Sequence, residues 1–207
     1  MTDKAIVIVV DDDSAVRDSM RSLLESAGYT VRDYPSAAAF LKDPVPPGSC
    51  LVTDIRMPEM DGLELQEEIK KRGLDIPVVI MTGHGDVPLA VRAMKAGALD
   101  FVEKPFDDQA MLASVERALL IGHQERARLA EAKAAQELIA RLTPRERNVL
   151  EKLVAGRSNK VAAYELGISP RTIEIHRANI MDKMRARSLS DVVRIALAAD
   201  HSRAGHA

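Results

Sequence analysis

The stretch that decides the fold is Ile6-Val7-Ile8-Val9-Val10-Asp11-Asp12-Asp13, in which five consecutive Ile and Val residues lead directly into three aspartates. An apolar run without polar alternation is typical of a strand in a parallel sheet that is covered on both faces. Further strand patterns follow at 30–34, 51–53, 77–81 and 99–103. Helical patterns come between and after them, at 14–27, 36–42, 62–72, 87–96 and 107–121.

This alternation of strands and helices predicts the fold class of the first part of the chain. It favours an α/β fold with a doubly wound, five-stranded parallel sheet, as in flavodoxin-like domains. In sheets of this kind, ligands bind at the carboxyl ends of the strands. Residues at those ends are therefore the first candidates for a functional site.

Beyond residue 121 the strand patterns stop. Residues 122–139 are rich in Ala, Glu, Arg, Gln and Leu, which predicts a helical linker that continues the preceding helix. Residues 140–200 predict a second, all-α domain of four helices, at 144–154, 159–166, 170–184 and 190–199. The expected organisation is therefore a first domain at 1–121, the linker, the second domain, and a flexible tail at 201–207.

The second domain carries two local patterns. Thr143, Pro144 and Glu146 fit the N-cap, N1 and N3 positions of a capping box, so a helix begins there. Two later helices are separated only by Gly167-Ile168-Ser169. A three-residue turn between two short helices is the spacing of a helix-turn-helix DNA-binding motif.

Composition and charge limit the classes of function. The net charge of the 207 residues is −2, but residues 1–122 carry 13 basic and 21 acidic side chains, whereas residues 140–207 carry 13 basic and 7 acidic. The basic second part favours a polyanionic partner. Cys50 is the only cysteine, which excludes an internal disulfide and leads us to expect a cytoplasmic location. We find no signal-peptide pattern or membrane-spanning apolar run, so we expect neither secretion nor a membrane partner.

Charged and hydroxyl side chains follow four of the predicted strands. Asp11 and Asp12 come after the first strand, Asp54 after the third, Thr82 after the fourth and Lys104 after the fifth. Clustered carboxylates repel each other unless a hard cation binds between them, and oxygen ligands suit Mg²⁺ or Mn²⁺. A hydroxyl and an ammonium beside such a site can bind phosphoryl oxygens. The pattern predicts in-line phosphoryl transfer to a carboxylate nucleophile.

Four short motifs contain these residues: Val10-Asp11-Asp12-Asp13, Asp54-Ile55-Arg56-Met57-Pro58, Met81-Thr82-Gly83 and Lys104-Pro105-Phe106. A fifth motif, Asp61-Gly62, follows the second of them. Together they resemble the CheY-like receiver domain of bacterial response regulators, over about residues 4–121. The resemblance implies that a sensor histidine kinase phosphorylates Asp54. It also implies that Asp12, Asp54 and the backbone carbonyl of Arg56 bind Mg²⁺ directly, with Asp11 acting through water. Thr82 and Phe101 would form the activation switch.

The stretch from Met81 to Ala98 is similar to the FixJ-type subset of receivers. In that subset, the surface of the fourth helix and fifth strand forms a dimer when the domain is phosphorylated. The similarity also suggests an oxygen-responsive or nitrogen-fixation circuit.

The helix predicted at 170–184 has two different faces. Ile173, Ile180 and Met184 form an apolar face that we expect to pack on Val149, Leu153 and Leu166. The rest of the helix and the one before it supply the predicted contacts to phosphates and to bases in the major groove, namely Lys160, Arg171, Thr172, Glu174, Ile175, His176, Arg177, Ala178, Asn179 and Lys183.

Three motifs of the second domain are Leu142-Thr143-Pro144-Arg145-Glu146-Arg147, Asn159-Lys160-Val161-Ala162 and Ile168-Ser169-Pro170-Arg171-Thr172-Ile173. They resemble the LuxR/NarL-type output domain over about residues 138–199. This implies a dimer on two DNA half-sites that meets through its last helix, with RNA polymerase as a further partner. Glu174 and Ala178 stand where some relatives have lysines, so affinity would depend on flanking basic residues.

The sequence therefore predicts a phosphorylation-controlled transcription regulator, which is a phosphoacceptor rather than an enzyme acting on other molecules. Two alternatives remain open. An aspartyl-phosphate phosphatase would use Asp54 transiently, but such enzymes need a second acid near the nucleophile, and Arg56 stands two residues on. A polymerase-binding or other protein-binding module would use the helix-turn-helix for protein contact instead of DNA.

Overall fold

The computed structural model describes residues 5–83 and 87–204 and divides into two compact units, residues 1–126 and 127–207. The first unit contains a five-stranded sheet in the order β2-β1-β3-β4-β5, in which all neighbouring strands are parallel. The strands are β1 (Ile6–Val10), β2 (Thr30–Tyr34), β3 (Cys50–Asp54), β4 (Val78–Thr82) and β5 (Asp100–Glu103). The predicted doubly wound parallel sheet is confirmed.

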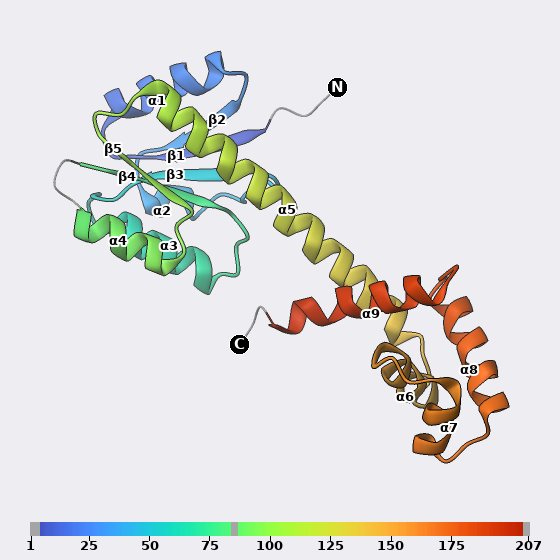
Figure 1. Ribbon diagram of the computed structural model, residues 1–207. Coiled ribbons are helices and arrows are strands. Elements are labelled where there is room, and N and C mark those ends of the chain that lie inside the picture. The colour runs from blue at the N-terminus through green and yellow to red at the C-terminus, as the bar shows by residue number, and fades with distance from the viewer. Residues whose placement is uncertain (1–4, 84–86, 205–207) are drawn as a thin grey trace. The chain divides into compact units, whose positions relative to one another are not determined.

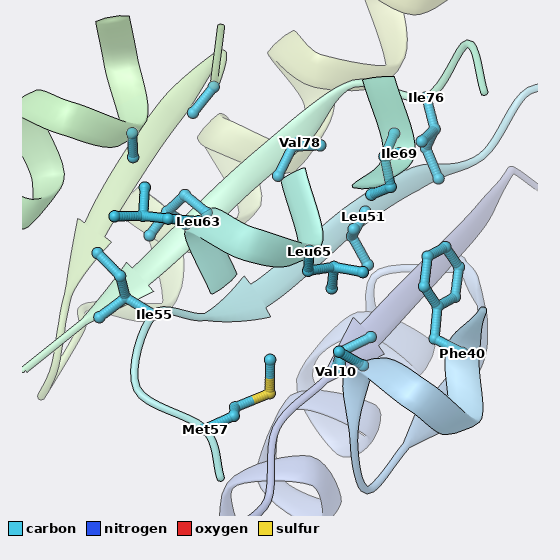
Figure 2. Packing of buried hydrophobic residues seen from close by; sticks show 14 of the residues in the cluster. Val10, Phe40, Leu51, Ile55, Met57, Leu63, Leu65, Ile69, Ile76 and Val78 are labelled. Carbon is cyan, nitrogen blue, oxygen red and sulfur yellow. The ribbon is translucent and has the colours of Figure 1, made fainter. Parts of the chain in front are cut away.

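Helices cover both faces of this sheet. They are α1 (Ser14–Ser26), α2 (Ala37–Phe40), α3 (Gly62–Lys71), α4 (Val87–Ala96) and α5 (Asp108–Ala140). The helices α1 and α5 pack on one face, and α2, α3 and α4 pack on the other (Figure 1). Figure 2 shows the second of these layers, in which apolar side chains of α2 and α3 lie against the sheet residues Leu51 and Val78. Each large aliphatic side chain buried in this way contributes roughly 1.5–3 kcal/mol to the free energy of unfolding.

Two local caps fix where helices begin beside the strand ends. The side chain of Asp13 accepts a hydrogen bond from the Ala15 N–H and so starts α1 directly after the acidic triplet. Asp61 and Glu64 form a complete capping box at the start of α3. Both caps stabilise the loops that follow β1 and β3.

The fifth helix continues through the segment predicted as a helical linker. It runs from Asp108 to Ala140, so residues 122–139 are helical and continue it without a break. The strong helix formers of this segment and the absence of Pro between Pro105 and Pro144 explain the continuity. Within the described ranges, the search for a helix both long enough and apolar enough to cross a membrane finds none.

The second unit contains four further helices, α6 (Pro144–Val154), α7 (Asn159–Leu166), α8 (Pro170–Lys183) and α9 (Leu189–Ala204). The predicted capping box of Thr143 and Glu146 is present at the start of α6. Gly167 adopts φ +66 between α7 and α8, a left-handed conformation that glycine tolerates best. The predicted face of α8 packs as expected, since Ile173 and Ile180 are fully buried with Val149.

The last helix ends later than predicted. The last helix was expected to end at about Ala199, before a flexible tail from residue 201, but α9 continues to Ala204. No glycine or proline stands between Ala199 and Ala204 to end it, and Gly205 is the first such residue. Residues 205–207 of the predicted tail lie outside the described residues.

Candidate functional site

The carboxyl ends of three adjacent strands bring the predicted pocket together. Asp11 directly follows β1, Asp54 ends β3 and Thr82 ends β4, and all three are buried, at 1%, 7% and 3% exposure. The register places Asp54 beside Met81, one residue before Thr82. Lys104 follows β5, and its N–H donates to the Thr82 carbonyl at 2.7 Å. Strand register therefore sets the relative positions of these residues.

The Lys104 ammonium lies between two carboxylates. Its Nζ donates to Oδ2 of Asp11 at 2.7 Å and to Oδ1 of Asp54 at 2.5 Å. Burial lowers the pKa of Lys104, but the hydrogen bonds to the two carboxylates outweigh it, so its pKa is raised. Lys104 thus holds a fixed positive charge at the strand edge, where it neutralises part of the carboxylate charge.

Each oxygen of Asp54 has a defined partner. Oδ1 accepts from Lys104, and Oδ2 accepts from the backbone N–H of Arg56 at 2.7 Å. Burial raises the pKa of the Asp54 carboxyl above its usual value, and the Lys104 ammonium and the Arg56 N–H offset this only in part. The carboxylate is therefore held in one orientation, with its charge directed toward the edge of the sheet.

The other predicted members of the pocket lie around this pair. Asp12 and Arg56 are exposed, and Phe101 on β5 is 45% exposed. The hydroxyl of Thr82 donates to the Gly83 carbonyl at 3.3 Å. Among the residues that the structure describes, no three His, Cys, Asp or Glu side chains are grouped closely enough to hold one metal ion. The pocket carboxylates nevertheless provide the oxygen donors that Mg²⁺ prefers.

Gly62 lies beside the pocket, at a position that residue chemistry alone did not indicate. A Cβ at this position would lie 2.4 Å from the backbone oxygen of Asp54 and 3.0 Å from the Cα of Ile55. The Gly62 N–H also donates to the Ile55 carbonyl at 3.0 Å. The first turn of α3 therefore packs directly on the backbone that carries Asp54. A glycine immediately after the N-cap Asp61 was the available signal.

The outward face of α8 is the second candidate site. Arg171, Glu174, Ala178 and Asn179 are exposed, as predicted for residues facing a major groove, and Ile175 is 56% exposed. A large aliphatic side chain exposed on a helix amid polar residues is suited to contact with a thymine methyl group.

Comparison with known proteins identifies both units. Residues 7–116 match the response regulator receiver domain family, and residues 140–196 match the family of bacterial regulatory proteins of the luxR type. The chain is 55% identical over 201 residues to the transcriptional regulatory protein FixJ of Azorhizobium caulinodans, covering 96% of this chain and 95% of that protein. It is 53% identical over 204 residues to FixJ of Bradyrhizobium diazoefficiens, covering 96% and 98%.

Solved structures agree. Full-length FixJ from B. japonicum superposes with a TM-score of 0.61 at 49% identity, covering 97% of this chain and 99% of that chain. The response regulator StyR superposes with a TM-score of 0.79 at 44% identity, covering 93% and 98%. The chain belongs to the response-regulator family. It is a FixJ-like response regulator with a receiver and a LuxR-type DNA-binding domain. These matches favour neither the phosphatase nor the protein-binding alternative.

Several predicted DNA contacts of this response regulator are engaged within its second unit. Lys183 Nζ bonds both carboxylate oxygens of Glu146, at 2.9 and 2.7 Å, and Arg177 Nη1 donates to Asn159 Oδ1 at 2.6 Å. His176 Nδ1 is buried without a hydrogen-bond partner among the described residues. The contacts of Lys183 and Arg177 therefore help to position α8 in the structure.

The remaining predicted contacts in the response regulator's second unit are Thr172 and Lys160. The backbone N–H of Thr172 donates to the N-cap hydroxyl of Ser169 at 3.1 Å, so Thr172 belongs to the start of α8. Lys160, on α7, is exposed. Sequence spacing could not separate inward-facing from outward-facing cations, because the partners Glu146 and Asn159 lie 37 and 18 residues away in the chain.

Proposed function

We propose that Asp54 is the phosphoacceptor of this response regulator and that a sensor histidine kinase is the phosphoryl donor. The observation that carries the proposal is the bridge by Lys104 between Asp11 and Asp54 at the carboxyl ends of adjacent strands. A carboxylate oriented by two hydrogen bonds and flanked by a buried hydroxyl and an ammonium is equipped for acyl-phosphate formation.

The residues have separate roles in the transfer. An oxygen of Asp54 attacks the phosphorus of the donor phosphohistidine; a new O–P bond forms, the P–N bond breaks, and its electron pair stays on the leaving imidazole. The phosphoryl oxygens that gather charge in this step are then stabilised by the Lys104 ammonium and the Thr82 hydroxyl. Hydrolysis of the acyl phosphate is a reaction of the protein on itself, so no external substrate is turned over.

The proposal extends to a divalent cation at these carboxylates. Asp11, Asp12, Asp54 and the backbone carbonyl of Arg56 would hold Mg²⁺, or Mn²⁺ in its place. When bound, the cation supplies positive charge that offsets the phosphoryl oxygens and orients the donor. The buried Asp11 and Asp54 support this assignment, because Lys104 brings only one positive charge to these two carboxylates.

Phosphorylation is proposed to promote dimerisation through α4 and β5. Val91, Met94 and Phe101 are exposed apolar side chains on these elements, at 47%, 40% and 45%. Exposed apolar side chains gathered on neighbouring elements are typical of an interaction surface. Thr82 and Phe101 would change position together on activation, which links the pocket to this surface.

The dimer is proposed to bind double-stranded DNA at two half-sites and to regulate transcription with RNA polymerase. The outward residues Arg171, Glu174, Ile175, Ala178 and Asn179 of α8 would enter the major groove. A second half-site gives the dimer a higher effective concentration for its second contact, so a modest dimerisation energy changes occupancy. The FixJ resemblance extends the proposal to an oxygen-responsive or nitrogen-fixation circuit, and partners of this kind imply the cytoplasm.

The test uses the full chain and a small phosphodonor such as acetyl phosphate. Wild-type protein is expected to gain one acyl phosphate by intact mass and to shift from monomer to dimer in sedimentation. Asp54→Asn keeps the side-chain shape but removes the nucleophile, so it should show neither change. Asp13→Asn is the matched control. Asp13 caps α1, and Asn can also fill that role, so this variant should respond to the donor like wild type. Donor-induced dimers in Asp54→Asn that equal those of wild type would overturn the proposal.

A further inference from the structure

A guanidinium from α1 contacts the backbone of the carboxylate pocket. Arg17 Nη1 donates to the carbonyl oxygen of Asp11 at 2.8 Å and to that of Asp12 at 3.1 Å. Its Nε lies 3.3 Å from Oδ2 of Asp33, near the end of β2. The Arg17 side chain is only 16% exposed. One side chain therefore connects the end of β1, the start of α1 and the end of β2.

These contacts require a particular backbone geometry. In an extended strand, successive residues point to opposite faces and successive carbonyls point in opposite directions. A single nitrogen that bonds the carbonyls of both Asp11 and Asp12 holds them on the same side. The chain therefore leaves strand geometry at this point, and Arg17 stabilises that departure. Asp13 supports it from the other direction, since its N–H donates to Oδ1 of Asp11 at 2.9 Å.

This geometry matters for two neighbouring aspartates that serve one site. Asp11 and Asp12 could not direct their carboxylates to the same strand edge if β1 continued through both. We propose that Arg17 is a positioning residue that sets the geometry of Asp11 and Asp12 for binding the divalent cation. The inference rests on the proposed function, because it takes the pocket to be the cation site.

Arg21 provides a matched control on the same helix. It lies one turn further along α1 and also pairs with Asp33, and its other ion pair is with Glu25. Among the described residues, it makes no hydrogen bond to a pocket carbonyl of the kind that Arg17 makes. Arg21→Ala removes the same charge from the same helix as Arg17→Ala does. A difference between the two variants therefore reports the contact with the pocket backbone and not the loss of a nearby positive charge.

The experiment measures binding of Mn²⁺ alone to the full chain, by the electron paramagnetic resonance signal of the free ion. Arg17→Ala is expected to weaken Mn²⁺ binding about 10-fold, in the range found when groups that orient metal ligands are removed. Arg17→Lys keeps the charge but loses the fork of the guanidinium, so it should stay weakened by several-fold. Arg21→Ala should remain close to wild type. Thermal unfolding verifies that each variant is folded, and Arg17→Lys serves alone if Arg17→Ala is not.

Three results would overturn the inference: wild-type affinity in Arg17→Ala, equal weakening in Arg17→Ala and Arg21→Ala, or full recovery in Arg17→Lys. Either of the last two results would mean that Arg17 acts only through its positive charge and not through its contact with the pocket backbone. Labelling of the wild type by acetyl phosphate is scored separately. If Mn²⁺ binds as expected but no acyl phosphate forms, the proposed function fails while the role of Arg17 stands.

Discussion

At the scale of single residues, Lys104 decides the electrostatics of the pocket. Asp11 is 1% exposed and Asp54 is 7% exposed, so neither carboxylate is well solvated. The ammonium between them stabilises the carboxylate charges in place of the missing water. Removing one member of such a group leaves uncompensated buried charge, which costs more than the group itself contributes.

Lys104→Met should therefore destabilise the metal-free protein in a pH-dependent way. We expect the free energy of unfolding to fall by about 3 kcal/mol near pH 7, the size found when one partner of a buried pair is removed. Without the ammonium, the folded-state pKa of Asp54 rises further above its unfolded value. The variant keeps its stability at pH values below the pKa of Asp54 in the unfolded chain. It loses stability as the pH rises through the pKa of Asp54 in the folded chain. Urea unfolding with a chelator should show a deficit that narrows toward about pH 4; a constant deficit would contradict this account.

Gly62 gives a second prediction at this scale. Gly62→Ala places a Cβ 2.4 Å from the Asp54 carbonyl, so backbone must move. We expect a loss of about 1–3 kcal/mol in the free energy of unfolding, comparable to overpacking a core, together with slower labelling of Asp54 by acetyl phosphate. Gly28→Ala is the control, since its Cβ would meet nothing within 4 Å and only its φ of +93 is strained. Equal labelling rates in the two variants would disprove the role of Gly62.

At the scale of elements, Glu146 joins the start of α6 to the end of α8. Its carboxylate caps the Thr143 N–H at 2.8 Å and receives two hydrogen bonds from Lys183. The bonds from Lys183 lower the pKa of Glu146 most, and burial opposes them. A carboxyl whose folded pKa is lowered stabilises the fold above its unfolded pKa, and that contribution is lost as the pH falls.

Glu146→Gln should consequently lose stability at neutral pH. We expect about 2 kcal/mol, because the charged hydrogen bonds to Lys183 are lost from a largely buried side chain. The gap from wild type should shrink as the pH falls below about 4.3, the ordinary pKa of Glu, and through the lowered pKa of folded Glu146, because the unfolded wild-type chain binds the proton first. Glu165→Gln, which breaks a surface pair with Lys152, should lose much less. Hydrogen exchange of the α6 amides measures both; equal effects would reject the role of Glu146.

The elements themselves could largely be predicted from the sequence, because their signals are local. Apolar runs set the strands, and Asp61 and Thr143 mark helix starts by capping. Contacts between distant residues could not be predicted. Nothing near Lys183 in the chain shows that it pairs with Glu146, and nothing near Arg17 shows that it reaches the carbonyl of Asp12. The predicted order of the strands was enough to place the pocket residues at one edge of the sheet. Which of their side chains are in contact depends on side-chain length and orientation, which the sequence pattern does not give.

At the scale of the whole molecule, the charges of the chain are divided between its parts. Residues 1–122 carry 8 more acidic than basic side chains, whereas residues 140–207 carry 6 more basic than acidic. An excess of positive charge favours binding to DNA. In the structure, however, some of these basic side chains bond to other residues of the same unit. Lys183 bonds to Glu146, and Arg177 bonds to Asn159. We therefore expect the exposed basic side chains to make the contacts with DNA phosphates.

The salt dependence of DNA binding separates these two groups of cations. Each phosphate contact releases counterions, so removing one should flatten the plot of log affinity against log salt by about 0.9. We expect that change for Lys160→Ala and for Arg171→Ala, with random duplex and phosphorylated full-length protein. Lys183→Gln should instead lower thermal stability and leave the slope near wild type. Fluorescence anisotropy across a salt series measures the slopes. An unchanged slope in both Lys160→Ala and Arg171→Ala would mean that other cations bind the phosphates, and a flatter slope in Lys183→Gln would mean that Lys183 leaves Glu146 to bind DNA.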